Sequence, residues 1–152
     1  MTIISERQAQ QLSDLFSARA HERVTILLFT QQEQDGAPEG VIGKANDDAR
    51  ALLEEVVALA PTWLTLEPHD LSIDAAEARV LAIDRTPAIV LRGRAAGRVR
   101  TFGVPADYEF TTLINDLLDL ASGGHTELSE RTREALALLR RPVHLQVFEA
   151  PT

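Results

Sequence analysis

The apolar run at Val24–Phe29 (VTILLF) constrains the fold more than any other part of the sequence. A short, continuous apolar run suits a strand that is covered on both faces, as at the centre of a sheet between layers of helices. Residues 5–20 and 46–59 have the apolar spacing of amphipathic helices, and residues 62–66 alternate like a second strand. The order helix, strand, helix, strand favours a right-handed crossover between parallel strands. The sequence therefore predicts an α/β fold.

The remainder of the chain predicts a hairpin and further helices. The expected elements are a loop at 31–44, a helix at 74–82, strands at 88–91 and 99–102 around a turn at 93–97, a helix capped by Asp107 that ends at Gly123 and Gly124, a helix begun by Thr126 or Ser129, and a strand at 143–148. Asp74 and Glu77 fit a capping pattern for the helix at 74–82. Because the hairpin strands are antiparallel, we expect a mixed sheet.

The sequence contains no cysteine, which excludes disulfides, iron–sulfur clusters and a cysteine nucleophile within this chain. Its 152 residues fit one compact domain. The net charge of -8 makes nucleic acid and anionic membranes unfavourable partners, since both carry charge of the same sign. No stretch reaches the roughly 18 apolar residues of a membrane helix, and the first residues do not form a secretory signal. We expect a cytoplasmic protein without a cofactor or metal.

Two motifs carry a resemblance to a known fold. The segment Ile83–Leu91 (IDRTPAIVL) resembles the one in which thioredoxin-fold proteins hold a cis-proline beside the redox site. The segment Phe102–Phe110 (FGVPADYEF) is similar to the F-G-x-P-x-G-x-E-F stretch of glutaredoxin-like protein disulfide oxidoreductases. The N-terminal domain of the alkyl hydroperoxide reductase flavoprotein subunit has a similar stretch. Asp107 departs from this pattern, because it stands at the position of the second glycine. The likeness extends from Ile4 to Thr152 and implies a thioredoxin-like three-layer fold, with a mixed central sheet flanked by helices.

The resemblance also implies a redox site and a second unit. In the disulfide oxidoreductases a Cys-x-x-Cys pair follows the first strand of the first unit, whereas the first unit of the alkyl hydroperoxide reductase domain lacks this pair. In both families a second thioredoxin unit follows the first. Here the vestigial redox-site region comprises Gln31, Gln32, Glu33, Gln34, Thr86 and Pro87, and we expect a cis Thr86–Pro87 bond. Residues 1–122 then form the thioredoxin-like domain. Residues 123–152 form a C-terminal helix and strand, the start of a second unit that is missing or absent.

Two groups of side chains are candidate partner-binding surfaces. The basic group is Arg92, Arg94, Arg98 and Arg100, which suits an anionic partner, although hairpin tips are ordinarily solvated. The apolar group is Val143, Leu145 and Val147, which stay exposed unless the domain's own sheet edge, a second copy or another protein covers them. We expect a protein partner or a homodimer. The histidines His21, His69, His125 and His144 lack metal-site spacing and are interpreted as surface or hydrogen-bonded residues.

Two functions remain open at this point. The first is a redox-inactive thioredoxin-like scaffold or interaction module related to disulfide or peroxide metabolism, because thiol–disulfide exchange requires a thiolate that attacks a sulfur. The second is the N-terminal part of a two-unit protein disulfide oxidoreductase whose cysteines lie beyond Thr152. A third possibility is a non-redox enzyme that uses the loop at 31–44, for which no nucleophile or base can be named. We assign no catalytic residue to this chain.

Overall fold

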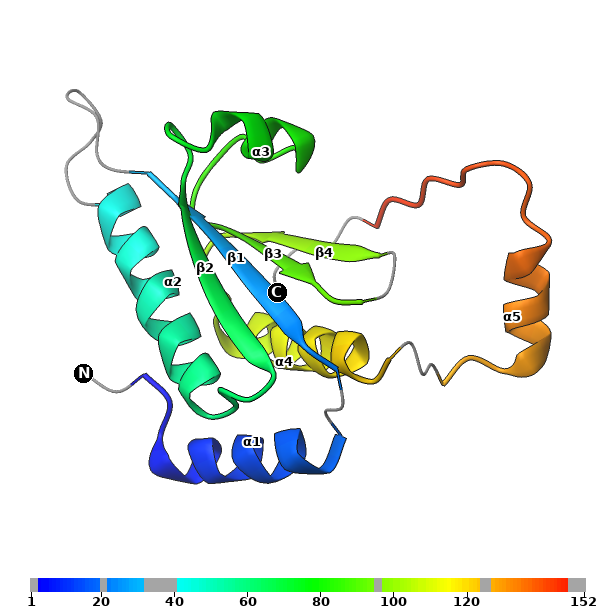
Figure 1. Cartoon of the computed structure of the whole chain (residues 1–152), viewed down its shortest axis with the longest axis horizontal. Helices are drawn as coiled ribbons and strands as arrows, with labels where there is room; N and C mark the ends of the chain where they lie inside the picture. Colours follow the sequence, from blue (N-terminus) through cyan, green and yellow to red (C-terminus); the bar gives the residue numbers. More distant parts are fainter. Residues whose placement is uncertain (1–2, 20–21, 32–40, 95–96, 124–126, 148–152) are drawn as a thin grey trace.

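β1 (Val24–Thr30) lies inside a four-stranded sheet in the computed structural model, which describes residues 3–19, 22–31, 41–94, 97–123 and 127–147 (Figure 1). The strand order is β2-β1-β3-β4. The other strands are β2 (Leu64–Asp70), β3 (Ala88–Arg92) and β4 (Arg98–Phe102). β1 is parallel to β2 and antiparallel to β3, and β3 is antiparallel to β4. The predicted mixed sheet is confirmed, although β2 extends past the predicted 62–66 because its pairing with β1 continues to Asp70.

Helices cover both faces of this sheet (Figure 1). The helices are α1 (Glu6–Arg19), α2 (Val41–Ala58), α3 (Ala75–Val80), α4 (Asp107–Ala121) and α5 (Glu130–Ala137). α1, α2 and α4 enclose a main core, and α3 covers the opposite face over a smaller core. Because successive side chains of a strand point to opposite faces, Ile26 and Leu28 enter the main core, while Leu27 and Phe29 enter the α3-side core. This double burial confirms the three-layer interpretation of the apolar run.

Several helix starts differ from the predicted ones. α2 begins at Val41 and not at residue 46, so the predicted loop at 31–44 is too long at its C-terminal end. Gly43 lies in the first turn of α2, and a glycine inside a helix costs about 1 kcal/mol relative to alanine. The packing of this long helix offsets that cost. Asp107 is not the cap of α4; the cap is Ala106, and Asp107 has a φ of 49°. Asp74 precedes α3 without a side-chain capping bond.

Ser129 does cap α5, through a 3.2 Å bond from the Thr132 amide to its Oγ. Thr126 lies outside the described residues.

The Thr86–Pro87 peptide bond is cis, and Pro87 is buried just before β3. The carbonyl of Pro87 accepts a 2.9 Å hydrogen bond from the amide of Gly103, which directly follows β4. Gly103 has a φ of 95°, a conformation that side chains strongly disfavour. The glycine therefore allows the segment before α4 to turn against Pro87.

The arm, residues 127–147, contains α5 and a following segment without secondary structure (Figure 1). The predicted strand at 143–148 does not form: residues 143–147 belong to no strand, and residue 148 lies outside the described residues. A strand exists only through pairing, and within the described part of the chain the sheet contains β1 to β4 alone. α5 buries none of its side chains. No helix in the described ranges has the length and apolar composition needed to cross a membrane.

Candidate functional site

The candidate site lies at the end of the sheet where β1 and β2 stop. Thr30 pairs with Asp70 there, and Phe29 pairs with Ala88, the residue directly after Pro87. The structure therefore places Gln31, Thr86 and Pro87 at one end of the sheet. Gln32, Glu33 and Gln34, the other predicted members of the vestigial region, lie outside the described residues.

A polar cleft of about 600 Å³ occupies this end, between α2 and the ends of β1 and β2. Its lining residues are Thr30, Gln31, Gly43, Asn46, Asp47, Arg50, Pro68, His69 and Asp70. Both acidic and basic groups line the cleft. The cleft thus occupies the region in which the resemblance implies a redox site, with polar side chains in place of thiols.

Two side chains of α2 connect the helix to the end of β1. Asn46 is buried, and its Nδ2 donates a 2.8 Å bond to the carbonyl of Gln31, while its Oδ1 has no partner among the described residues. Arg50 donates a 3.4 Å bond to Thr30 Oγ1, which also lies 3.5 Å from the carbonyl oxygen of His69. Buried amide oxygens without partners are uncommon and costly. Asn46 therefore leaves an unused hydrogen-bond acceptor beside the cleft.

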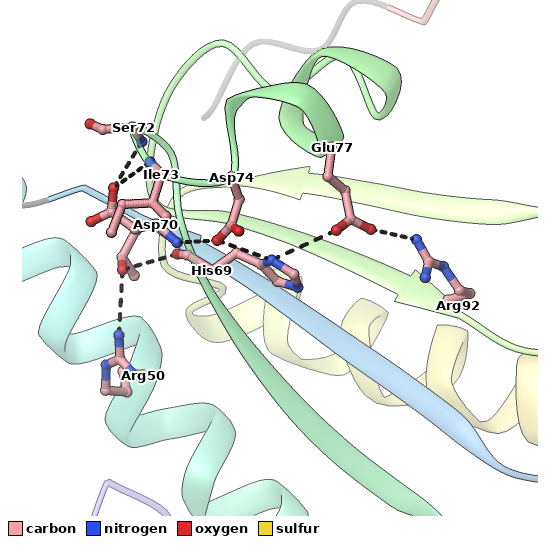
Figure 2. Close-up of polar contacts among 9 residues, drawn as sticks. Arg50, His69, Asp70, Ser72, Ile73, Asp74, Glu77 and Arg92 are labelled. Carbon is pink, nitrogen blue, oxygen red and sulfur yellow. Dashed lines mark hydrogen bonds and ion pairs between the residues drawn. The ribbon is translucent and has the colours of Figure 1, made fainter.

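His69 anchors a polar cluster on the α3 side of the sheet (Figure 2). Its Nδ1 lies 3.3 Å from Asp74 Oδ2 and 3.8 Å from Glu77 Oε2, and Glu77 also pairs with Arg92 at 3.1 Å. Asp74 Oδ2 accepts a 2.9 Å bond from the amide of Asp70. The imidazole stacks on Phe29 with ring centroids 4.8 Å apart, and its Nε2 is buried without a partner in the described part of the chain. The cluster joins the end of β2 to α3.

A second hollow, of about 470 Å³, lies among the N-terminal segment, α2 and the loop before α4. Apolar side chains such as Ile4, Leu52 and Phe110 line it, together with Lys44, Asp48 and Asp107 among the charged residues. Lys44 Nζ lies 2.6 Å from Asp48 Oδ2, and this hydrogen bond, aided by the carboxylate charge, raises the pKa of Lys44 above its ordinary value. The ion pair keeps both charges at the rim of an otherwise largely apolar groove.

The arginines of the predicted basic surface are mostly engaged within the chain. Arg92 pairs with Glu77, and Arg94 pairs with Glu22, each at 3.1 Å. Arg100 donates a 2.6 Å bond to the carbonyl of Leu81 and lies 5.8 Å from the ring centre of Phe102. Arg98 is exposed. The hairpin therefore offers less free positive charge than four arginines suggest, and its partner-binding role stays a prediction.

The apolar candidates Val143, Leu145 and Val147 are 61%, 86% and 82% exposed. They lie on the arm and do not adjoin the polar cleft or the second hollow, which other elements line. The predicted partner-binding residues thus fall into two separate groups, on the hairpin and on the arm. Within the described residues no cluster of three or more His, Asp or Glu side chains could hold a metal ion.

Sequence reasoning missed Asn46, Arg50 and the surroundings of His69. Asp74 and Glu77 fit a capping pattern in the sequence, yet their carboxylates face an imidazole that precedes them in the chain. No local signal in the sequence identified this contact, because His69 lies beyond the predicted strand at 62–66 and α3 carries one acid, Glu77, and one base, Arg79. His144 is exposed, in agreement with its interpretation as a surface residue, while His21 and His125 lie outside the described residues.

No protein-family model and no curated protein sequence matches the chain. Solved structures do match. The N-terminal domain of the alkylhydroperoxide reductase AhpF from Enterococcus faecalis shares 25% identity with a TM-score of 0.70, over 90% of this chain and 61% of that one. A second structure of AhpF from this organism has 24% identity and a TM-score of 0.71, with the same coverage. A protein disulfide oxidoreductase from Aeropyrum pernix has 22% identity and a TM-score of 0.69, over 89% of this chain and 55% of that one.

The chain therefore spans only about 61% and 55% of the lengths of these structures. The similarity nevertheless extends over 90% of this chain in both AhpF structures. The sequence retains no cysteine with which to form a Cys-x-x-Cys pair. From its mixed sheet and these similarities we conclude that the chain has the thioredoxin fold, without the cysteine pair, and resembles the N-terminal unit of the alkylhydroperoxide reductase AhpF and of protein disulfide oxidoreductases.

Proposed function

We propose that the chain is a redox-inactive thioredoxin-fold module that serves as a scaffold or protein-interaction domain in disulfide or peroxide metabolism, in the cytoplasm. The observation that carries the proposal is a thioredoxin fold in a chain without cysteine. Thiol–disulfide exchange needs a thiolate nucleophile and a sulfur that it attacks, so this chain supplies neither side of the reaction. The fold can still provide a surface that binds another protein.

The polar cleft supports this view. Asn46, Arg50 and Thr30 fill the region between β1 and α2 with hydrogen-bonding groups. None of these groups is a nucleophile with an adjacent base, since the imidazole of His69 faces α3 and not α2. The arrangement favours binding over covalent catalysis.

An insulin-reduction assay with dithiothreitol as the electron donor tests the inactive assignment. We expect no turnover above that of dithiothreitol alone, while a cysteine-containing thioredoxin in a parallel reaction reduces insulin. Turnover by the purified chain, free of contaminating thioredoxins, would contradict the proposal.

A second candidate function is supported by the partial coverage of the matched structures and by the exposed arm. The chain matches about 61% and 55% of those chains, and the arm leaves an unpaired segment at 143–147. Both features suit the N-terminal part of a two-unit protein disulfide oxidoreductase, with its cysteines beyond Thr152. Immunoblotting of a native extract separates the two candidates, because a two-unit protein migrates well above the 152-residue chain.

A further inference from the structure

The segment at 143–147, here called the tail segment, has a strand pattern without a strand partner. Val143, Leu145 and Val147 alternate with His144 and Gln146, and the three apolar side chains are mostly exposed. A segment outside the sheet leaves its backbone groups without sheet partners and its apolar side in water. Addition to the edge of a sheet would pair the backbone groups of the segment and bury its apolar side chains.

β4 provides an open edge of matching length. It is the outer strand beyond β3, and it contains five residues, as many as the tail segment. The other edge strand, β2, contains Pro68, which has no amide hydrogen to donate to a further strand. Of the two edge strands in the described sheet, β4 is therefore better able than β2 to pair with an added strand.

The two faces of β4 match the two faces of the tail segment. Val99 packs against the main core, whereas Arg100 reaches the carbonyl of Leu81 on the α3 side. Arg98 shares the α3 side with Arg100, because alternate residues of a strand share a face. A tail segment paired with β4 can direct Leu145 toward the side of Val99 and Gln146 toward the arginines. The amide oxygen of Gln146 can accept hydrogen bonds from a guanidinium, and the segment carries no lysine or arginine that would repel the arginines of β4.

The presence of both halves of the contact on each chain favours a second copy of this chain as the occupant. A specific interface buries about 1,600 Å² in total, and a single short strand on one edge supplies only a fraction of this area. Each copy carries both a tail segment and an open β4, so a reciprocal exchange forms two identical contacts about a twofold axis. Within one chain the structure leaves the tail segment and the β4 edge unpaired with each other.

We propose that the tail segment of one copy pairs with the outer edge of β4 of a second copy, and that the exchange is reciprocal. The proposal rests on the proposed function as an interaction module and identifies a partner for its arm. Val143, Leu145 and Val147 are then interface residues.

Light scattering coupled to size-exclusion chromatography of the full chain, over a range of concentrations, tests the exchange. We expect a dimer whose dissociation constant rises at least tenfold for Leu145→Arg. Gln146→Glu should tighten the dimer by about two- to fivefold through cross-strand attraction to Arg98 and Arg100, and Gln146→Arg should weaken it comparably. Leu145 and Gln146 are both exposed in the single chain, so circular dichroism should show unchanged folding of all three variants.

Three outcomes overturn the exchange. A full chain that is monomeric at all concentrations removes the second copy, and a dimer that Leu145→Arg leaves intact removes the tail segment. A dimer that Gln146→Arg tightens instead places the tail in the second hollow, beside Asp48 and Asp107. None of these outcomes bears on the insulin assay, so the exchange can fail while the inactive assignment stands, and the reverse also holds.

Discussion

At the scale of single residues, two polar side chains that line the polar cleft carry atoms that are costly to bury. His69 and Asn46 each place one polar atom in the interior without a partner among the described residues. Asp107 adopts a positive φ of 49° at the position where the similar families often have glycine. Aspartate tolerates this conformation better than most side chains do, which explains how the substitution preserves the turn before α4.

Asp116 on α4 is expected to make stability depend on pH. Partial burial raises its pKa above the ordinary 3.8, and the negative charge of Asp119 adds to the effect. A carboxyl with a raised folded-state pKa favours the folded state at low pH and loses this contribution as the pH rises through the folded pKa. Asp116→Asn should therefore raise the free energy of unfolding at pH 7, by less than about 1 kcal/mol because water screens the partly exposed group.

Urea denaturation at pH 7 and at pH 3 measures this change. The gain should shrink below pH 3.8, where the carboxyl becomes protonated in both states. Glu109→Gln in the first turn of α4 is the matched control, since its side chain is exposed and its charge favours the helix dipole. A gain of equal size at pH 3 would refute the electrostatic origin.

At the scale of elements, α5 is the helix that depends least on the rest of the molecule. It has eight residues and buries no side chain. Isolated helices shorter than about 12 residues are marginal in water, so local capping contributes much of its stability. The Oγ of Ser129 is the capping acceptor for the Thr132 amide.

Ser129→Ala should lower the helicity of residues 130–137 while leaving global unfolding unchanged. Loss of a capping side chain costs about 1 kcal/mol, and in an unpacked helix this loss affects only the helix itself. Backbone chemical shifts report the local loss, and urea denaturation reports the global stability. Ser17→Ala on the exposed face of α1 is the control. A marked drop in global stability would show that α5 is packed against the domain.

The elements differ in how far the sequence could predict them. β1 was predictable because burial on both faces demands a continuous apolar run, and α4 because its wide apolar stripe has helical spacing. The start of α2 was missed because a stretch that contains several glycines is typical of a loop. The His69 cluster could not be predicted, since it depends on how α3 folds back over β2. The tail segment has a strand pattern, but pairing requires a partner that local sequence does not supply.

At the scale of the whole molecule, an aromatic contact helps to join α1 to the sheet. Phe16 packs edge-on against Trp63 with ring centroids 5.2 Å apart, and Phe16 is buried in the main core. The amides of Ile3 and Ile4 each donate a 2.8 Å bond to the carboxylate of Glu55 on α2, which fixes the chain ahead of α1. The N-terminal helix is thus part of the domain's core.

Phe16→Ala should lower the free energy of unfolding by about 3–5 kcal/mol, the usual cost of deleting a buried aromatic ring. Trp63 is the only tryptophan, so its fluorescence reports the contact directly. Fluorescence and far-ultraviolet circular dichroism should follow one transition in the parent chain and in the variant, as expected for a small cooperative domain. Gln11 on the same helix is exposed, which makes Gln11→Ala the control. Separate transitions would mean that α1 unfolds independently.

The pairing of Lys44 with Asp48 at the rim of the second hollow has a practical consequence. Lys44 is the only lysine of the chain, and its side chain is 76% exposed. Amine-directed reagents therefore meet a single side-chain target, on α2. Because the chain has no thiol either, a cysteine introduced anywhere on the arm would be chemically unique. With the α-amine of the chain blocked, two dyes of different reactivity can then be attached at known places, and the separation between arm and domain becomes a measurable length.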